Sequence, residues 1–165
     1  MTRVLILTRH AKSSWDSPAL SDHDRPLNKR GRRSARAIAG WLREHNHLPD
    51  EVLSSTATRT RETWDRMGLQ ADKICFHRTL YHAEPNDMLI ELSGATEPTV
   101  LMLGHNPGIA GFASRIVRNP PSHPRFHDYP TCATTVIRFP FNDWAHVQWQ
   151  TGEVLDFIIP RELLE

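Results

Sequence analysis

The sequence predicts an α/β fold, a three-layer α/β/α sandwich in which helices cover both faces of a mostly parallel sheet. Short apolar runs that are partly β-branched, typical of buried strands, recur along the chain. Amphipathic segments typical of helices lie between them. Strands that alternate with helices indicate a parallel sheet. The 165 residues, 39% of them hydrophobic, suffice for one core, so we expect a single domain over residues 1–165.

The expected elements follow in order along the first two thirds of the chain. Predicted strands cover residues 4–7, 51–53 with their flanks, and 99–103. Predicted helices cover residues 28–45, 58–67 and 107–117. In the first helix, apolar or small residues recur at steps of three and four opposite a basic face, as an amphipathic helix requires. They are Ala35, Ile38, Ala39 and Leu42.

The last third of the chain has a weaker pattern. Residues 119–129 mix prolines and histidines with polar residues, which favours an irregular loop. A strand is expected at 133–139, and a hairpin around Thr151-Gly152 is expected within 149–159. These strands could be antiparallel at the sheet edge, and the pattern does not fix their order.

Composition restricts the partners. Lys and Arg total 20 against 19 Asp and Glu, so the formal charge of +1 provides no general field for nucleic acid or an anionic membrane. No apolar segment approaches the roughly 20 residues that span a bilayer, and the apolar run near the N-terminus is too short for a signal peptide. Two cysteines are too few for a disulfide framework. We expect a cytoplasmic monomer without nucleic-acid or membrane partners.

Polar residues follow three of the predicted strands. Arg9-His10 follows the first strand, Ser54-Ser55 the second, and Gly104-His105-Asn106 the strand at 99–103. Ligands of a parallel sheet bind beyond the carboxyl ends of its strands, so we expect these residues at one cleft. Each segment alone is weak evidence, because a histidine at a strand end is more often a satisfied polar residue than a catalyst.

Two of these segments also precede helices, whose N-termini favour anions. Ser54 or Ser55 can cap the helix at 58–67, and Arg59 then lies one turn inside, near the positive end of the helix. A solvated basic face on that helix is the alternative interpretation. Because the three segments converge on one edge, they favour a phosphate site.

Four short motifs occur in order along the first two thirds of the chain. They are Leu7-Thr8-Arg9-His10-Ala11, Asp24-Arg25-Pro26-Leu27 with Gly31, Ser55 through Thr63, and Leu103-Gly104-His105. In order and spacing they resemble the histidine phosphatase superfamily, also called the phosphoglycerate mutase-like family, and most closely its short SixA-type phosphohistidine phosphatase branch. The resemblance implies a phosphatase that acts on phosphohistidine in a protein or on a related phosphomonoester.

The resemblance also implies roles for single residues. His10 becomes the nucleophile, and Arg9, Arg59 and His105 form the phosphate pocket around it. A planar guanidinium can hold two phosphate oxygens, so no metal or cofactor is expected. The neighbouring arginines favour a neutral imidazole, which can attack phosphorus. Ser13 is included among the expected substrate-binding residues.

The sequence departs from the family pattern near His10. Ala11 replaces the usual glycine, a change that we expect to be tolerated. Asp16 stands where mutase-like members often carry an asparagine that donates to phosphate. An ionised carboxylate there would repel the substrate, so we expect Asp16 to point elsewhere.

The general acid is left open between two residues. Counting from Leu80 places His82 where larger family members carry a glutamate, and Glu84 lies two residues further on. Either side chain could protonate a leaving group. A surface loop without chemistry is the alternative interpretation.

Other nucleophiles and metal sites have less support. Cys132 and Arg138 have the spacing of a cysteine-dependent phosphatase loop, but the residues between them lack glycine and favour a strand. Asp22-His23-Asp24 and His45-x-His47 form no recognised zinc pattern with further partners nearby.

Two further functional readings stay open. A small-metabolite phosphomonoesterase or a mutase of the same superfamily would use the same residues, although no long insertion covers a bisphosphorylated intermediate. A non-enzymatic phosphate-binding module would hold a phosphorylated partner without turnover, although the two histidines favour an enzyme. The expected partner is a phosphorylated protein or a small phosphorylated substrate.

Overall fold

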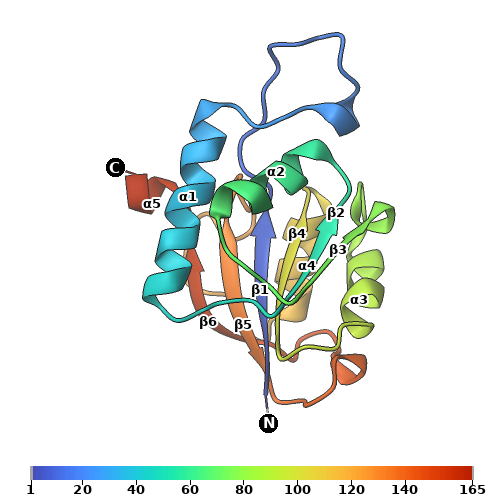
Figure 1. Ribbon diagram of the computed structural model, residues 1–165. Coiled ribbons are helices and arrows are strands. Elements are labelled where there is room, and N and C mark those ends of the chain that lie inside the picture. Colours follow the sequence, from blue (N-terminus) through green and yellow to red (C-terminus); the bar gives the residue numbers. More distant parts are fainter. Residues whose placement is uncertain (1, 165) are drawn as a thin grey trace.

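Six strands form one mixed sheet in the computed structural model, which describes residues 2–164 (Figure 1). They are β1 (Arg3–Arg9), β2 (Glu51–Ser55), β3 (Lys73–His77), β4 (Thr99–Gly104), β5 (Thr134–Phe139) and β6 (Glu153–Ile158). Their spatial order is β3-β2-β4-β1-β5-β6. The first four strands in this order pair in parallel, and β5 is antiparallel to both β1 and β6. The sheet is therefore mostly parallel.

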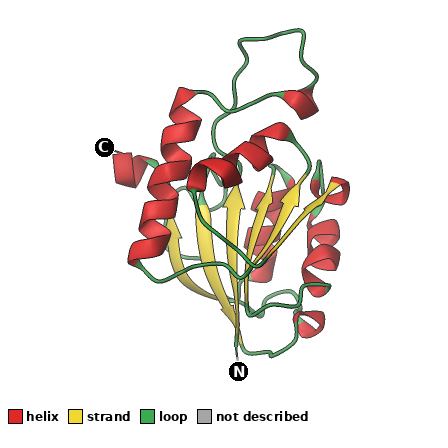
Figure 2. Cartoon of the chain, in the orientation of Figure 1, coloured by secondary structure: helices red, strands yellow, loops and turns green. Residues whose placement is uncertain are grey.

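Helices cover both faces of this sheet (Figure 1, Figure 2). On one face lie α1 (Lys29–Glu44), α2 (Thr58–Met67) and the short α5 (Arg161–Leu164), and on the other lie α3 (Pro85–Ser93) and α4 (Gly108–Ile116). Three 3-10 turns connect these elements, η1 (Asp22–Asp24), η2 (Arg78–Leu80) and η3 (Trp144–His146). The predicted three-layer α/β/α sandwich is confirmed. Within residues 2–164, no helix combines the length and apolar character needed to cross a membrane.

The side chains of β1 alternate between the two layers of the core. Leu5 and Leu7 pack in the cluster that contains Phe112 of α4, whereas Ile6 packs in the cluster that contains Ile38 of α1. All five side chains are fully buried. Because a central parallel strand is covered on both faces, it needs an uninterrupted apolar run, which is the pattern that predicted it.

The predicted boundaries are close for elements with a strong pattern. The prediction for α2 matches residue for residue, and α1 and α4 are one residue shorter at each end than their predicted ranges. Residues 119–129 form an irregular loop, as predicted. No boundaries were predicted for β3 and α3. The strand β3 lies at the sheet edge with Lys73 and Ile74 exposed, so it lacks the continuous apolar run of a buried strand.

The prediction of a hairpin around Thr151-Gly152 is wrong. This segment instead bonds to the end of α4, where Gly152 N–H donates to the Ile116 carbonyl at 2.9 Å. A Cβ on Gly152 would lie 2.4 Å from Cγ2 of Ile137, so the glycine permits close packing and does not mark a turn between strands. The strand β6 pairs with β5 across a longer connection that contains η3.

The carboxyl ends of β1, β2 and β4 meet at one edge of the sheet, at the top in Figure 1. Two glycines let helices approach the loops at this edge. A Cβ on Gly31 of α1 would lie 2.1 Å from the Lys12 carbonyl oxygen, and one on Gly108 of α4 would lie 1.9 Å from the Ala83 carbonyl oxygen. The loop after β1 is thus packed directly against α1.

Candidate active site

A cavity of about 350 Å³ lies at the carboxyl ends of these strands. Its lining contains Arg9, His10, Lys12, Ser13, Trp15, Asp22, Arg25, Arg59, His82, His105, Asn106 and Thr131. The fold therefore brings together the nucleophile and the three phosphate-pocket residues that the sequence predicts. It also places Ser13 and His82 in the lining, but not Glu84.

His10 lies directly after β1 and is only 6% exposed. Its Nδ1 is 2.7 Å from the carbonyl oxygen of Ala11. Because a carbonyl oxygen can only accept, Nδ1 carries the proton in this hydrogen bond. The pKa of His10 is lowered to about 3, chiefly by burial and also by the charges of Arg9 and Arg59, although the Ala11 hydrogen bond acts to raise it. The imidazole is therefore neutral at pH 7, and Nε2 keeps its lone pair.

Two arginines stand beside this histidine, of which Arg59 is buried and Arg9 is half-buried. Arg59, the second residue of α2, donates from Nη1 to the Asp22 carbonyl at 2.6 Å and from Nη2 to Asp22 Oδ2 at 3.0 Å. Arg9, the last residue of β1, donates from Nη1 to the Tyr129 carbonyl at 3.1 Å. Burial, followed by the charge of Arg59, lowers the pKa of the Arg9 guanidinium. Both arginines have a buried Nε without a hydrogen-bond partner among the described residues.

His105 follows β4 and completes the predicted group. Its ring centroid is 5.1 Å from that of His10, and its Nε2 is 2.8 Å from Ser55 Oγ. The pKa of His105 is lowered to about 2, chiefly by burial and also by His10 and Arg59. The prediction that Ser54 or Ser55 caps α2 is wrong, because Ala57 is the N-cap residue and Ser55 Oγ instead contacts His105.

The carboxylate of Asp22 is a part of the site that sequence reasoning missed. Its Oδ2 contacts Nη2 of Arg59 and accepts from the Tyr81 hydroxyl at 2.5 Å, and its Oδ1 accepts from Nη2 of Arg25 at 3.1 Å. The Tyr81 hydrogen bond above all, and then Arg59 and Arg25, hold the pKa of Asp22 well below its usual range. An ionised carboxylate therefore neutralises part of the positive charge of the cavity.

Arg25 and Trp15 extend the site along the loop after β1. Arg25 is 8% exposed and donates from Nη1 to Ser13 Oγ at 2.7 Å. The Trp15 ring covers its guanidinium at 3.5 Å but is itself 76% exposed. Ser13, predicted to bind substrate, thus holds Arg25 in place at the cavity wall. The spacing Asp22-x-x-Arg25 is the sequence signal that could have indicated this cluster.

The two acid candidates occupy different places. His82 is exposed in the cavity lining, and its Nε2 lies 3.6 Å from Asp22 Oδ2. Glu84 is the N-cap residue of α3, outside the lining, where its N–H donates to Asp87 Oδ2 at 2.9 Å. Asp16 is exposed and also lies outside the lining, in agreement with the expectation that its carboxylate points away from the phosphate pocket. The carboxylate that does reach the phosphate-pocket arginines comes from Asp22.

The alternative nucleophile and metal sites gain no support. Cys132 is fully buried, and burial raises the pKa of its thiol to about 12. Arg138 lies on β5 and pairs instead with Glu153 at 2.9 Å. Among residues 2–164, no group of three or more His, Cys, Asp or Glu side chains is arranged to hold a metal ion. A thiolate-based reaction is therefore disfavoured, since only the deprotonated sulfur is a strong nucleophile.

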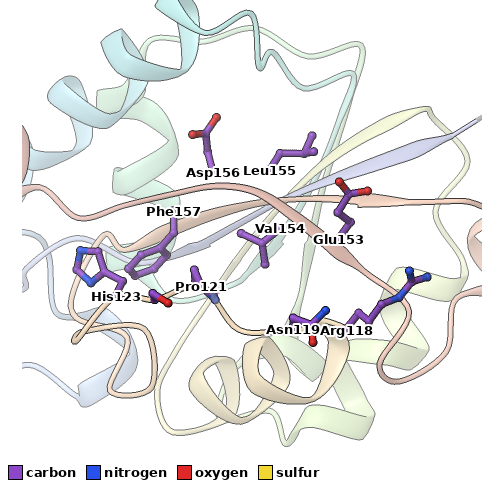
Figure 3. A pocket seen from close by; sticks show the side chains of 10 residues that line it. Arg118, Asn119, Pro121, His123, Glu153, Val154, Leu155, Asp156 and Phe157 are labelled. Carbon is purple, nitrogen blue, oxygen red and sulfur yellow. The ribbon is translucent and has the colours of Figure 1, made fainter.

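Another cavity, of about 510 Å³, lies along β6 and the loop at 118–123 (Figure 3). Val154 and Phe157 point toward the part of this loop that carries Pro121 (Figure 3). The lining mixes Arg118 with Glu153 and other polar and apolar groups, and it includes none of the predicted phosphate-pocket residues. The smaller cavity at the strand ends is therefore the candidate active site.

Known proteins are similar to this chain in sequence and in fold. Residues 5–79 match the model of the histidine phosphatase superfamily, branch 1. The uncharacterized protein Rv1276c of Mycobacterium tuberculosis is 34% identical over 160 residues, covering 93% of this chain and 99% of the relative. A solved structure described as a candidate phosphohistidine phosphatase SixA from Nakamurella multipartitia is 31% identical, with a TM-score of 0.83 and 97% of each chain covered. Another, from Agrobacterium tumefaciens, is 27% identical, with a TM-score of 0.75 and 96% and 98% covered.

The relative from Mycobacterium tuberculosis and the structure from Nakamurella multipartitia extend over almost the whole chain at 34% and 31% identity, so the chain belongs to the histidine phosphatase superfamily. Within the superfamily it falls in the SixA-type branch, whose structures align with nearly its full length. The family resemblance predicted from the four motifs is thereby confirmed.

Proposed function

We propose that this protein is a phosphatase that transfers a phosphoryl group from phosphohistidine in a protein, or from a related phosphomonoester, to His10 and then to water. The tautomer of His10 is the observation that supports it best. Nδ1–H donates to the Ala11 carbonyl, and burial keeps the ring neutral, so the Nε2 lone pair is free to attack phosphorus. A residue serving only to bind phosphate would need a donor at this place and not a lone pair.

The reaction is an in-line displacement in two steps. Nε2 of His10 forms a bond to phosphorus while the bond from phosphorus to the leaving nitrogen or oxygen breaks. Water then attacks the phosphorus of phospho-His10 and releases inorganic phosphate. One water is consumed in total, and its hydroxyl group goes to phosphate while its proton replaces the phosphoryl group on the leaving group.

Fixed cations supply the positive charge that the transferred group requires. Arg59 is buried in the first turn of α2 and Arg9 is half-buried at the end of β1, and a guanidinium can meet two equatorial phosphate oxygens at once. His105, with Nε2 bonded to Ser55, has a buried Nδ1 without a partner among the described residues and can donate to a third oxygen. These side chains make a metal-independent reaction feasible.

The position of His82 makes it the better candidate for the acid. Because His10 is buried whereas His82 and Asp22 are exposed in the same lining, in-line attack directs the leaving group away from His10 and toward these exposed residues. Glu84 stays a prediction without a contact to the cavity. An imidazole leaving from phosphohistidine needs less protonation than an alkoxide, so a site whose candidate acid is solvent-exposed favours phosphohistidine.

Hydrolysis rates on phosphohistidine, phosphoserine and a small phosphorylated metabolite test this proposal. We expect phosphohistidine to react fastest, with no loss of rate in the presence of a chelator. His82→Gln should lower phosphoserine hydrolysis by at least about tenfold, the low side of acid–base contributions of roughly 10² to 10⁴, and phosphohistidine hydrolysis much less. Glu84→Gln is the matched control and should change neither rate.

Each other outcome has a defined meaning. Tight phosphate binding without turnover of any substrate would identify a non-enzymatic binding module. A preference for small metabolites would favour a phosphomonoesterase or mutase of the same superfamily. Equal losses on both substrates in His82→Gln would show that His82 positions phosphate and is not the acid.

A further inference from the structure

A second cavity, of about 310 Å³, adjoins the candidate active site. Lys12 and Thr131 line both cavities, so the two share a wall. The other walls come from the first turns of α1, from the loop before β5 and from the start of α5. A substrate that presents its phosphoryl group to His10 therefore lies next to this second cavity.

The second cavity is strongly basic. Lys12, Arg30, Arg125 and Arg161 line it, and none of the described lining residues carries a carboxylate. Lys12 and Arg30 form no ion pair with any described residue, and Arg125 pairs with Asp128 at 2.9 Å. Since the whole chain has a formal charge of only +1, this concentration of charge is local. Cations gathered in a concave surface attract anions.

Backbone contacts fix this basic cavity relative to the nucleophile. Asn28 N–H donates to the Lys12 carbonyl at 3.0 Å, which ties the shared wall to the start of α1. Cys132 N–H donates to the His10 carbonyl at 2.9 Å, which ties the residue after Thr131 to the catalytic histidine itself. An anion bound in the second cavity would therefore be held at a defined place beside His10.

We propose that this cavity is a subsite for a second anionic group of the substrate. The inference rests on the proposed phosphatase function. The group bound there would be a carboxylate or a phosphate. A protein substrate carries such groups near its phosphohistidine on acidic side chains, and a small substrate carries one as a second charged group. Such a subsite would select substrates by charge pattern, because charge complementarity contributes strongly to specificity.

Two pairs of substrates distinguish a protein substrate from a small substrate as the source of the second anion. One pair is a phosphohistidine peptide with flanking glutamates and the same peptide with glutamines. The other is a small phosphomonoester with a carboxylate and its uncharged amide. In the pair that matches the natural class of substrate, kcat/KM of the wild type should be about tenfold higher for the substrate with the extra carboxylates at low salt. This ratio of kcat/KM values should fall as the salt concentration increases.

Arg30→Gln should reduce this ratio to near one without changing the hydrolysis of p-nitrophenyl phosphate, which has no second anion. Arg33→Gln is the matched control, because Arg33 is an exposed residue of the same helix outside the cavity. It should keep the wild-type ratio.

Binding of the unphosphorylated peptides, followed by fluorescence anisotropy, provides a readout that does not require turnover. The acidic peptide should bind the wild type more tightly than the glutamine peptide, and Arg30→Gln should remove the difference. If no substrate is hydrolysed, the proposed function fails while this binding difference still tests the subsite. Equal rates and equal binding for acidic and neutral partners, or an unchanged preference in Arg30→Gln, would overturn the subsite.

Discussion

Asp22 and Arg59 are in contact in the lining of the candidate active site, although they are 37 residues apart in the sequence. In this contact Asp22 accepts hydrogen bonds from Nη1 and Nη2 of Arg59, which could also donate to phosphate oxygens. A phosphate dianion that binds Arg59 therefore either displaces the Asp22 carboxylate or is repelled by it. Asp22 thus acts as an internal competitor of the substrate in the proposed mechanism.

This competition predicts that Asp22→Asn binds inorganic phosphate more tightly. Removal of one charge at about 4 Å in a solvated setting is worth about 1 kcal/mol, so the inhibition constant should fall about fivefold. Inhibition by phosphate at several concentrations measures this change. Asp24→Asn is the control, because among the described residues the Asp24 carboxylate pairs with no arginine, lies 3.4 Å from His23 Nδ1 and is 62% exposed. Weaker phosphate binding by Asp22→Asn would show that Asp22 organises Arg59 for phosphate.

The sequence identifies the residues at strand ends better than those on loops. His10, Arg9 and His105 follow strands whose burial pattern is visible in the sequence, and the parallel sheet then brings them to one edge. The position of Asp22 depends on the path of the loop after β1, and the Asp22-x-x-Arg25 spacing does not by itself fix that path. Residue type alone suggests Asp22 only as a metal ligand with His23 and Asp24, an interpretation that the sequence disfavours, and it does not show that arginines bind this carboxylate.

Among the elements, α1 is the helix that supports the site, because its first turn packs on the loop carrying Lys12. Gly31 allows this approach, since an added Cβ would lie 2.1 Å from the Lys12 carbonyl oxygen. Backbone atoms cannot move aside as a flexible side chain can, so Gly31→Ala must separate the helix from the loop.

We therefore predict opposite effects for two Gly→Ala changes on this one helix. Gly31→Ala should lower the free energy of unfolding by about 1–3 kcal/mol, the usual effect of overpacking, and should also lower turnover. Gly40→Ala should raise it by about 0.5–1 kcal/mol, because a Cβ there meets nothing within 4 Å and alanine favours a helix. Chemical denaturation measures both. Equal effects at the two positions would contradict the packing described for Gly31.

Element prediction succeeded where burial on both faces produces a long apolar run, and it failed at the sheet edges. The strand β3 has exposed residues, and the segment before β6 carries a turn-like Thr151-Gly152 that packs against Ile137 instead. Such edge elements are defined by long-range packing, which a local pattern does not contain.

For the whole molecule, the buried neutral histidines make stability depend on pH. The folded-state pKa is about 3 for His10 and about 2 for His105, whereas an unfolded histidine has a pKa of about 6.5. Below pH 6.5 the unfolded chain binds protons that the folded chain excludes, so stability present above this pH is lost as pH falls toward 3. The carboxylate of Asp22, whose pKa is also lowered, adds its own loss only near and below pH 4.

Between pH 6.5 and 4.5 the slope should therefore reflect these histidines, each contributing up to about 1.4 kcal/mol per pH unit. Urea denaturation at several pH values measures the slope. His105→Gln should make it shallower, because this variant has one fewer histidine to protonate in the unfolded chain. An unchanged slope in His105→Gln would show that His105 is accessible to protons in the folded state.

The formation of phospho-His10 is the central claim, and trapping it is the most direct test. Rapid mixing with a phosphohistidine substrate, quenching in base, and mass spectrometry of the intact protein and its peptides would detect one phosphoryl group. We predict that it is acid-labile, that it lies on Nε2 of His10 and that it disappears at the rate of turnover. His10→Ala should show neither the phosphoryl group nor turnover. Wild-type turnover without a phosphorylated protein, together with activity in His10→Ala, would contradict the account.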